Sequence, residues 1–327
     1  MSMGRVVIAC HSGPKIGLGH LRRCQFLKER LPAQINRKVE WVHVGATDQE
    51  QNKTDQQVSS LDDFFTSLHE EPTAGLVLDF HPDHIDMDEL GTFCKKVRRK
   101  GIWIVALDRL GGLLPLIDLL FVPCFFSKHL HPKVCFGWDH YLVPVWNQPD
   151  KDESVLVLSG GGDPLGFGDW LPDFLIRHIP EPFHIHWVQG PHAKPPTLPT
   201  KPPRWTTWKN PPQLQELLGK TKVVITAYGV SFFESLRSQA LTILLEPQKL
   251  CERTELSLLE AENLCLIAQD QSQLEDRLKD AFSNIEPYRK FFARKVQALM
   301  GPHSGDQKLA DWILAQPSQM PSSPDLI

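Results

Sequence analysis

The chain has 327 residues, 41% of them hydrophobic, and a formal net charge of −4 from 35 Lys and Arg against 39 Asp and Glu. This length favours two α/β domains of about 150 residues each, the slightly acidic balance argues against a nucleic-acid partner, and no apolar run approaches the roughly eighteen residues that span a bilayer. We therefore expect a soluble, cytoplasmic protein without a transmembrane segment.

The seven cysteines are widely spaced and include no C-x-x-C pair. This spacing is typical of reduced thiols rather than of a disulfide framework or a zinc site. We expect the protein to need neither a metal nor another cofactor.

The stretch from Ile16 to Cys24 joins a predicted strand at 6–10 to a predicted helix at 21–31. Gly17 and Gly19 can adopt positive φ and let a ligand approach the backbone. His20 then falls near a helix N-terminus, where free N–H groups and the helix dipole attract anions. The pattern predicts a titratable imidazole beside an anion site, and its structural alternative is a glycine turn that the histidine merely caps.

Further strands are predicted at 41–45, 76–79, 102–107 and 119–122, with helices at 61–69 and 87–100. Two of these strands end in an acid, Asp79 and Asp108. Ligands of open parallel sheets bind outside the carboxyl ends of the strands, so such acids can serve a site or simply cap the next loop. We expect this first Rossmann-like domain to cover 1–148.

A charged linker at 145–154 leads to a predicted strand at 155–158, which opens a second domain over 149–315. The turn that follows contains Gly160, Gly161, Gly162 and Asp163, so its backbone N–H groups could cradle a phosphate. The alternative is a flexible turn.

Later strands are predicted at 184–188, 222–226 and 241–245, and helices at 213–218, 254–262, 271–282, 287–300 and 306–315, before a disordered tail at 316–327. After the strand at 222–226, Gly229 makes a turn and Ser231 is the expected N-cap. Glu234, three residues later, has the spacing of a capping box. The same carboxylate could instead accept both hydroxyls of a ribose.

These motifs together resemble the hydrolase of bacterial pseudaminic acid synthesis, which removes UDP from UDP-2,4-diacetamido-2,4,6-trideoxy-β-L-altropyranose. The resemblance spans about residues 6–315 at low similarity. It rests on Gly17-Leu18-Gly19-His20 with Arg22-Arg23-Cys24, on Gly161-Gly162-Asp163, and on Gly229 through Ser231 to Glu234.

The resemblance implies a fold of glycosyltransferase-B type, in which two Rossmann-like domains face a central cleft. It implies a catalytic role for His20, a diphosphate near Gly161 and Gly162, and a ribose on Glu234. We accordingly expect a UDP-sugar substrate whose sugar contacts Gly17, Gly19, Arg22, Asp79 and Tyr141, and whose nucleotide contacts Gly160, Gly161, Gly162, Asp163, Gly229, Ser231 and Glu234.

The chain also departs from that family. Tyr228 stands where a second glycine is usual, and Asp79-Phe80-His81 replaces an Asp-x-Tyr pattern. An arginine often found shortly after the tyrosine matched by Tyr141 is missing. These departures concern the sugar pocket more than the nucleotide pocket.

Three functions follow. The leading hypothesis is hydrolysis of a nucleotide-activated sugar with His20 as acid or base. The second is a glycosyltransferase, for which a membrane-bound acceptor would favour an apolar patch such as 110–126. The third is a non-catalytic nucleotide-sugar binder, against which the presence of His20 argues. The sequence does not select the sugar, the base or the oligomeric state.

Overall fold

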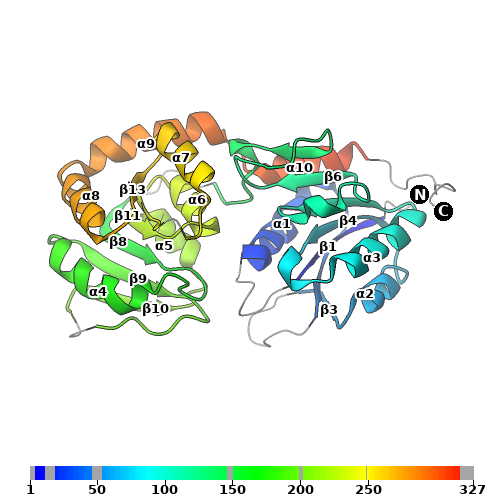
Figure 1. Ribbon diagram of the computed structural model, residues 1–327, viewed down its shortest axis with the longest axis horizontal. Coiled ribbons are helices and arrows are strands. Elements are labelled where there is room, and N and C mark those ends of the chain that lie inside the picture. The colour runs from blue at the N-terminus through cyan, green and yellow to red at the C-terminus, as the bar shows by residue number, and fades with distance from the viewer. Residues whose placement is uncertain are drawn as a thin grey trace. The chain divides into compact units, whose positions relative to one another are not determined.

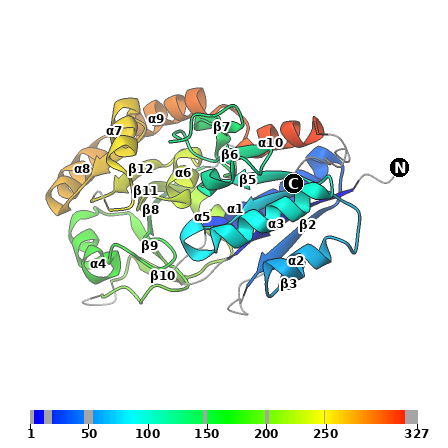
Figure 2. The same ribbon diagram turned by 45° about the vertical axis from the view of Figure 1, so that its right-hand side comes forward.

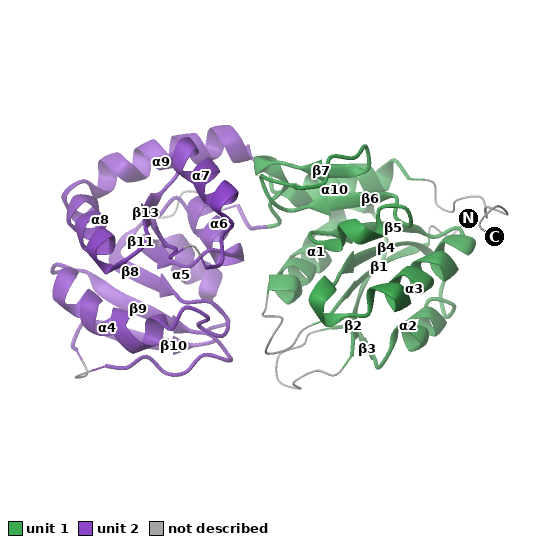
Figure 3. Ribbon diagram, viewed as in Figure 1, with its two compact units in different colours: residues 1–142, 303–327 green, residues 143–302 purple. Residues whose placement is uncertain are grey.

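The computed structural model describes residues 4–11, 19–45, 54–145, 150–198, 202–247 and 249–316. The chain forms two compact units (Figure 3): unit 1 contains residues 1–142 and 303–327, and unit 2 contains residues 143–302. Each unit is a parallel sheet with flanking helices (Figure 1). The predicted pair of parallel α/β domains is confirmed.

The described part of unit 1 forms one parallel sheet in the order β3-β2-β1-β4-β5-β6-β7. The strands are β1 (Arg5–Cys10), β2 (Val39–Val44), β3 (Gln56–Val58), β4 (Thr73–Asp79), β5 (Trp103–Leu107), β6 (Leu119–Val122) and β7 (Val134–Phe136). The helices are α1 (Gly19–Ile35), α2 (Leu61–Ser67), α3 (Met87–Arg99) and α10 (Gly305–Leu314), with short 3₁₀ turns at Pro82–His84, Leu110–Leu113 and Trp138–His140.

Both faces of this sheet are covered, because alternate residues of each strand feed two separate cores. In β1, Val7 and Ala9 pack toward α2 and α3, whereas Val6 and Ile8 pack toward α1 and α10. Figures 1 and 2 show these helices on the two sides of the sheet. Burial on both faces explains why the strands are continuous apolar runs rather than alternating ones.

The last helix, α10, belongs to unit 1, although we had placed residues up to 315 in the second domain. It packs on α1, and Asp306 accepts hydrogen bonds from Arg30 Nε at 2.6 Å and from Gln34 Nε2 at 2.7 Å. The backbone N–H of Gly305 donates to the Tyr141 carbonyl at 2.9 Å. A Cβ on Gly305 would lie 2.3 Å from the His140 carbonyl oxygen, so this close approach requires glycine. These contacts join residues that are far apart in the sequence.

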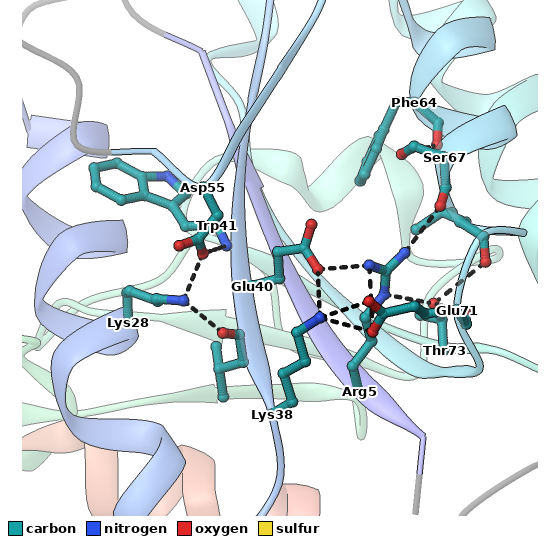
Figure 4. A network of polar contacts seen from close by, with 12 residues as sticks. Arg5, Lys28, Lys38, Glu40, Trp41, Asp55, Phe64, Ser67, Glu71 and Thr73 are labelled. Carbon is teal, nitrogen blue, oxygen red and sulfur yellow. Dashed lines mark hydrogen bonds and ion pairs between the residues drawn. The ribbon is translucent and has the colours of Figure 1, made fainter.

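The amino end of the unit 1 sheet is fixed by a polar network around Arg5 (Figure 4). The Arg5 guanidinium is 5% exposed and pairs with Glu40 Oε2 at 2.5 Å. It also donates to the Ser67 carbonyl at 2.9 Å and to Thr73 Oγ1 at 3.2 Å. Because this network lies at the amino end of the strands, opposite to where ligands of parallel sheets bind, we interpret it as structural.

In unit 2 the described strands form a parallel sheet in the order β10-β9-β8-β11-β12-β13. The strands are β8 (Asp152–Leu158), β9 (His184–Gln189), β10 (Trp205–Lys209), β11 (Thr221–Thr226), β12 (Leu241–Leu245) and β13 (Leu266–Ala268). The helices are α4 (Phe167–His178), α5 (Leu214–Lys220), α6 (Val230–Arg237), α7 (Arg253–Glu262), α8 (Gln271–Ser283) and α9 (Ile285–Met300). Side chains of α4, α8 and α9 fill the core on one face, and those of α5 fill the other.

Each sheet reverses its strand order once. In unit 1 the reversal lies between β1 and β4, and in unit 2 it lies between β8 and β11. Chains leave the two central strands in opposite directions at such a point, which opens a crevice beyond their carboxyl ends. The fold therefore directs attention to the residues that follow these four strands.

Candidate functional site

At the reversal in unit 1, the start of α1 lies next to Asp79, the acidic residue that ends β4. Cys10 and Asp79, the last residues of β1 and β4, are register partners. The helix that follows β1 begins at Gly19, so His20 lies in its first turn. Strand register and helix start together place the imidazole over the carboxylate.

His20 and Asp79 form a buried pair. His20 Nδ1 lies 2.6 Å from Asp79 Oδ1, and the two residues are 7% and 0% exposed. A carboxylate on Nδ1 holds the proton on that nitrogen, which fixes the ring orientation and makes Nε2 the nitrogen that can accept a further proton. The arrangement is that of a general base with an orienting carboxylate.

Arg23 shares the same carboxylate. Its guanidinium donates to Asp79 through Nε at 3.0 Å and through Nη2 at 2.8 Å, and to Asp108 Oδ2 through Nη1 at 2.8 Å. Burial acts to raise the pKa of Asp79, but Arg23 and His20 outweigh it and hold that pKa well below its usual range. Asp79 is therefore ionised at neutral pH.

Two further histidines flank His20. The His11 and His81 rings each have a centroid 5.9 Å from that of His20. The backbone N–H of His81 donates to His11 Nε2 at 2.6 Å. Burial and the nearby His20 lower the pKa of His11 to about 4, and burial and His20 also lower the pKa of His81. Both flanking imidazoles are therefore neutral at pH 7. His11 was not singled out in the sequence, and His81 was noted there only in place of the tyrosine of an Asp-x-Tyr pattern.

The other residues expected to contact the sugar differ in how exposed they are. Gly17 lies outside the described residues, and Gly19 is the first residue of α1. Arg22 is half-buried, one helix position before the buried Arg23. Tyr141 is 3% exposed, and its hydroxyl accepts from Phe125 N at 3.3 Å. Asp79 has no exposed surface and contacts His20, and its expected contact with a sugar stays a prediction.

The Gly-rich turn follows β8, as predicted, and β8 is one of the two strands at the reversal of unit 2. Gly160 has φ +89° and is exposed, as is Gly162, whereas Gly161 is half-buried. A Cβ on Gly190 would lie 2.4 Å from the carbonyl oxygens of Gly160 and Gly161, so the turn packs directly on another backbone segment. The exposed part of this turn presents backbone to solvent.

Asp163 has a local structural task. Its carboxylate accepts hydrogen bonds from Phe167 N at 2.9 Å and from Gly168 N at 2.7 Å, at the start of α4. The carboxylate therefore takes up donors that a phosphate would otherwise use at this helix terminus. The structure shows Asp163 capping α4, and its expected contact with a nucleotide stays a prediction.

The start of α6 differs from the expected capping box. Gly229 is the N-cap, with φ +152°, and the helix begins at Val230. Ser231 is thus the second helical residue and Glu234 the fifth, so the pair does not have the N-cap to N3 relation of a capping box. A Cβ on Gly229 would meet no atom of the described residues within 4 Å, so these residues leave open space at this helix terminus. Glu234 itself is 6% exposed.

Two buried polar atoms mark the carboxyl edge of the unit 2 sheet. Ser159 follows β8 and is 1% exposed, and Glu246 follows β12 and is 0% exposed. Among the described residues, Ser159 Oγ and Glu246 Oε2 have no hydrogen-bond partner. Glu246 Oε1, in contrast, accepts from the backbone N–H groups of Lys249 and Leu250 at 2.6 and 3.1 Å. Buried polar atoms without a partner are uncommon, and a bound water or a ligand is one way to satisfy them.

Among the described residues, no group of three or more His, Cys, Asp or Glu side chains is placed to hold a metal ion. Within the same ranges, no helix is long and apolar enough to cross a bilayer. Cys24, one turn after His20, is fully buried, and burial together with Cys10 raises its pKa, so it is not a reactive thiol.

No protein-family profile matches the sequence, and no curated protein matches it significantly. Solved structures do. The calicheamicin glycosyltransferase CalG4 has a TM-score of 0.60 over 96% of this chain and 98% of its own, at 12% identity. The spinosyn forosaminyltransferase SpnP has a TM-score of 0.60 over 96% and 100%, also at 12% identity. The UDP-GlcNAc 2-epimerase from Neisseria meningitidis bound to UDP-GlcNAc has a TM-score of 0.59 over 95% and 100%, at 11% identity. The chain thus has the two-domain Rossmann-like fold of glycosyltransferase-B type.

Proposed function

We propose that this protein hydrolyses a UDP-activated amino or deoxy sugar at its anomeric carbon and releases UDP and the free sugar. The observation that carries the proposal is the buried His20–Asp79 pair, with its 2.6 Å contact at the strand-order reversal of unit 1. Proton transfer to a histidine positioned in this way typically accelerates a reaction about 10²–10⁴-fold.

In the proposed reaction, His20 accepts a proton from water while the water oxygen forms a bond to the anomeric carbon. The bond between that carbon and the β-phosphate oxygen breaks, and its electron pair leaves with UDP. Asp79 stabilises the imidazolium that forms, because its carboxylate contacts Nδ1. Its role is to position and stabilise His20, since it has no exposed surface.

We assign the nucleotide to unit 2. Backbone N–H groups of the Gly160–Gly162 turn and of the open start of α6 would stabilise the diphosphate as it leaves. Glu234, in the second turn of α6, would accept the ribose hydroxyls. The choice of UDP is supported by the fold neighbour from Neisseria meningitidis, which holds UDP-GlcNAc. The resemblance of the sequence motifs to those of the hydrolase of pseudaminic acid synthesis supports water as the acceptor.

A glycosyltransferase is the second candidate, because CalG4 and SpnP share this fold over nearly their full length. The same histidine would then take the proton of an acceptor hydroxyl. A membrane-bound acceptor is not supported by the apolar segment at 110–126. Leu110, Leu113 and Leu120 of that segment are at most 2% exposed and belong to the core of unit 1. A soluble acceptor remains compatible with the fold.

The test is to incubate the full chain with a panel of UDP-sugars, without any acceptor, and to measure UDP release. The proposal predicts release from at least one UDP-sugar. It also predicts that His20→Asn loses at least about 100-fold in turnover while its UDP affinity in calorimetry is unchanged. His69→Asn, at an exposed histidine of unit 1, is the matched control.

Release only after a sugar or alcohol acceptor is added would favour the transferase. UDP-sugar binding without release under either condition would overturn both catalytic readings and leave a nucleotide-sugar binder.

A further inference from the structure

Arg23 occupies an unusual position, because its guanidinium is buried between two carboxylates and beside an imidazole. It is 8% exposed and contacts Asp79 twice, Asp108 once and His20 once, the last with Nη2 at 3.2 Å from Nδ1. Burial acts to lower the pKa of Arg23, but Asp79 and Asp108 outweigh it and raise that pKa above its usual value. Arg23 is therefore a permanent charge next to the proposed base.

Asp108 forms an ion pair with Arg23. It follows β5 with φ +62°, a left-handed conformation that is strained for residues other than glycine and that aspartate tolerates better than most. Its carboxylate is 28% exposed and reaches Arg23 Nη1 at 2.8 Å. The turn thus accepts some backbone strain while delivering a carboxylate to the far side of the guanidinium.

The charges of the four side chains then balance in a specific way. With His20 neutral, the two carboxylates and Arg23 sum to −1, and with His20 protonated the cluster is neutral. Without Asp108 the same two states would be neutral and +1. A buried cluster favours the state of lower net charge. Asp108 therefore favours the protonated form of His20, and Arg23 opposes it.

We propose that Arg23 and Asp108, which lie behind Asp79, act as a pair that sets how readily His20 takes up a proton. Arg23 shares the carboxylate that holds His20 and so weakens the imidazole as a base, while Asp108 offsets part of that effect. Both are positioning residues. The proposal concerns the proton equilibrium of His20 in the protein itself, and only its consequence for turnover rests on the proposed function.

Three other titratable groups near His20 are uncharged at neutral pH, so they do not shift its proton equilibrium as Arg23 and Asp108 do. His11 comes from the end of β1 and His81 from the end of β4, and burial, with His20 nearby, lowers the pKa of each. Arg109 and His84 also lower the pKa of His81, and His84 lowers that of His11. Cys24 lies against Asp79 and remains a neutral thiol, because burial and Cys10 raise its pKa. Arg23 and Asp79 are charged and contact His20, and Asp108 is charged and contacts Arg23.

The test follows the ring signals of His20 by NMR during a pH titration of histidine-labelled protein, with His20→Gln used for assignment. Arg23→Gln should move the midpoint of protonation upward by about one pH unit or more, since a charge within about 4–6 Å typically shifts a titration by about one to three units. Asp108→Asn should move it downward by a smaller amount, because Asp108 acts from beyond the guanidinium. Arg23→Lys, which keeps the charge, should stay closer to the wild type.

Opposite shifts for the two charge-removing variants would support the proposal, because a loss of structure alone moves both in one direction or neither. Equal midpoints in the wild type and Asp108→Asn, with the fold intact by circular dichroism, would overturn it. Asp108→Asn leaves the Arg23–Asp79 contacts in place and is the variant expected to fold even if Arg23→Gln does not. The titration needs no substrate, so it remains decisive even if no UDP-sugar is hydrolysed. If hydrolysis is found, the acidic limb of kcat/KM should move in the same two directions.

Discussion

Replacing Asp79 by asparagine removes one charge from the candidate site and almost no volume. The wild-type carboxylate is fully buried, receives three close contacts from His20 and Arg23, and has its pKa held well below the usual range. A carboxyl whose pKa falls by about two units on folding contributes roughly 2.6 kcal/mol to stability at pH 7. Arg23 keeps Asp108 as a partner in the variant, so the loss should stay below the 3–5 kcal/mol typical of a stranded buried charge.

We therefore expect Asp79→Asn to lower the free energy of unfolding by about 2–3 kcal/mol at pH 7. Because the folded pKa of Asp79 is depressed, its contribution is complete above the unfolded value of about 4 and is lost as the pH falls below it. Urea titrations from pH 7 to pH 3 should show the difference between the two proteins shrinking below about pH 4. Asp83→Asn, at an exposed carboxylate of the neighbouring turn, is the control, and we expect it to change stability by less than about 0.5 kcal/mol. A difference below 1 kcal/mol at pH 7, or one that grows toward pH 3, would refute the reasoning.

Other parts of the account can be tested in the same preparations. Glu234→Ala should weaken UDP binding in calorimetry by about 1.5–3 kcal/mol through loss of charged hydrogen bonds, and unchanged affinity would remove Glu234 from the nucleotide site. Turnover should survive EDTA, and a loss that Mg²⁺ restores would contradict a mechanism based on backbone donors. The pKa of His11 is about 4 in the folded protein against about 6.5 unfolded, so stability should fall by about 3 kcal/mol as the pH drops from 6.5 to 4. His11→Gln should flatten that slope in urea titrations. Asp306→Ala should lower the free energy of unfolding by about 2–3 kcal/mol, since it strands Arg30 and Gln34 between α1 and α10; a change below 0.5 kcal/mol would mean that this contact does not hold α10.

The fold was largely predictable, because buried parallel strands leave long apolar runs and their linking helices leave periodic ones. The strands that were not predicted, β3, β7, β10 and β13, lie at the edges of the two sheets. β3 has the largely polar sequence Gln56-Gln57-Val58, and β7 and β13 span only three residues each, so these three have no pattern of their own. The position of α10 was not predictable, since nothing local connects Asp306 to Arg30, 276 residues away.

In the candidate site, too, single residues could be predicted from local sequence motifs, whereas the contacts between them could not. His20 and Asp79 could be proposed separately, from a glycine loop and a strand end, but their contact depends on the register between β1 and β4. Arg23 could have been preferred over Arg22, because it lies three residues after His20 and shares the buried helix face with Leu27. The capping role of Asp163 and the helix start at Val230 depend on backbone geometry that the residue types alone leave open.

The central claim is that His20 directs water to the anomeric carbon of a UDP-sugar. The most direct measurement is turnover of a UDP-sugar in ¹⁸O-water without an acceptor, followed by mass spectrometry of both products for the wild type and His20→Asn. The account predicts label in the free sugar, none in UDP, and at least about 100-fold slower appearance of labelled sugar in the variant. Label in UDP would place the attack at phosphorus, and labelled sugar appearing equally fast in both proteins would show that His20 does not carry the reaction.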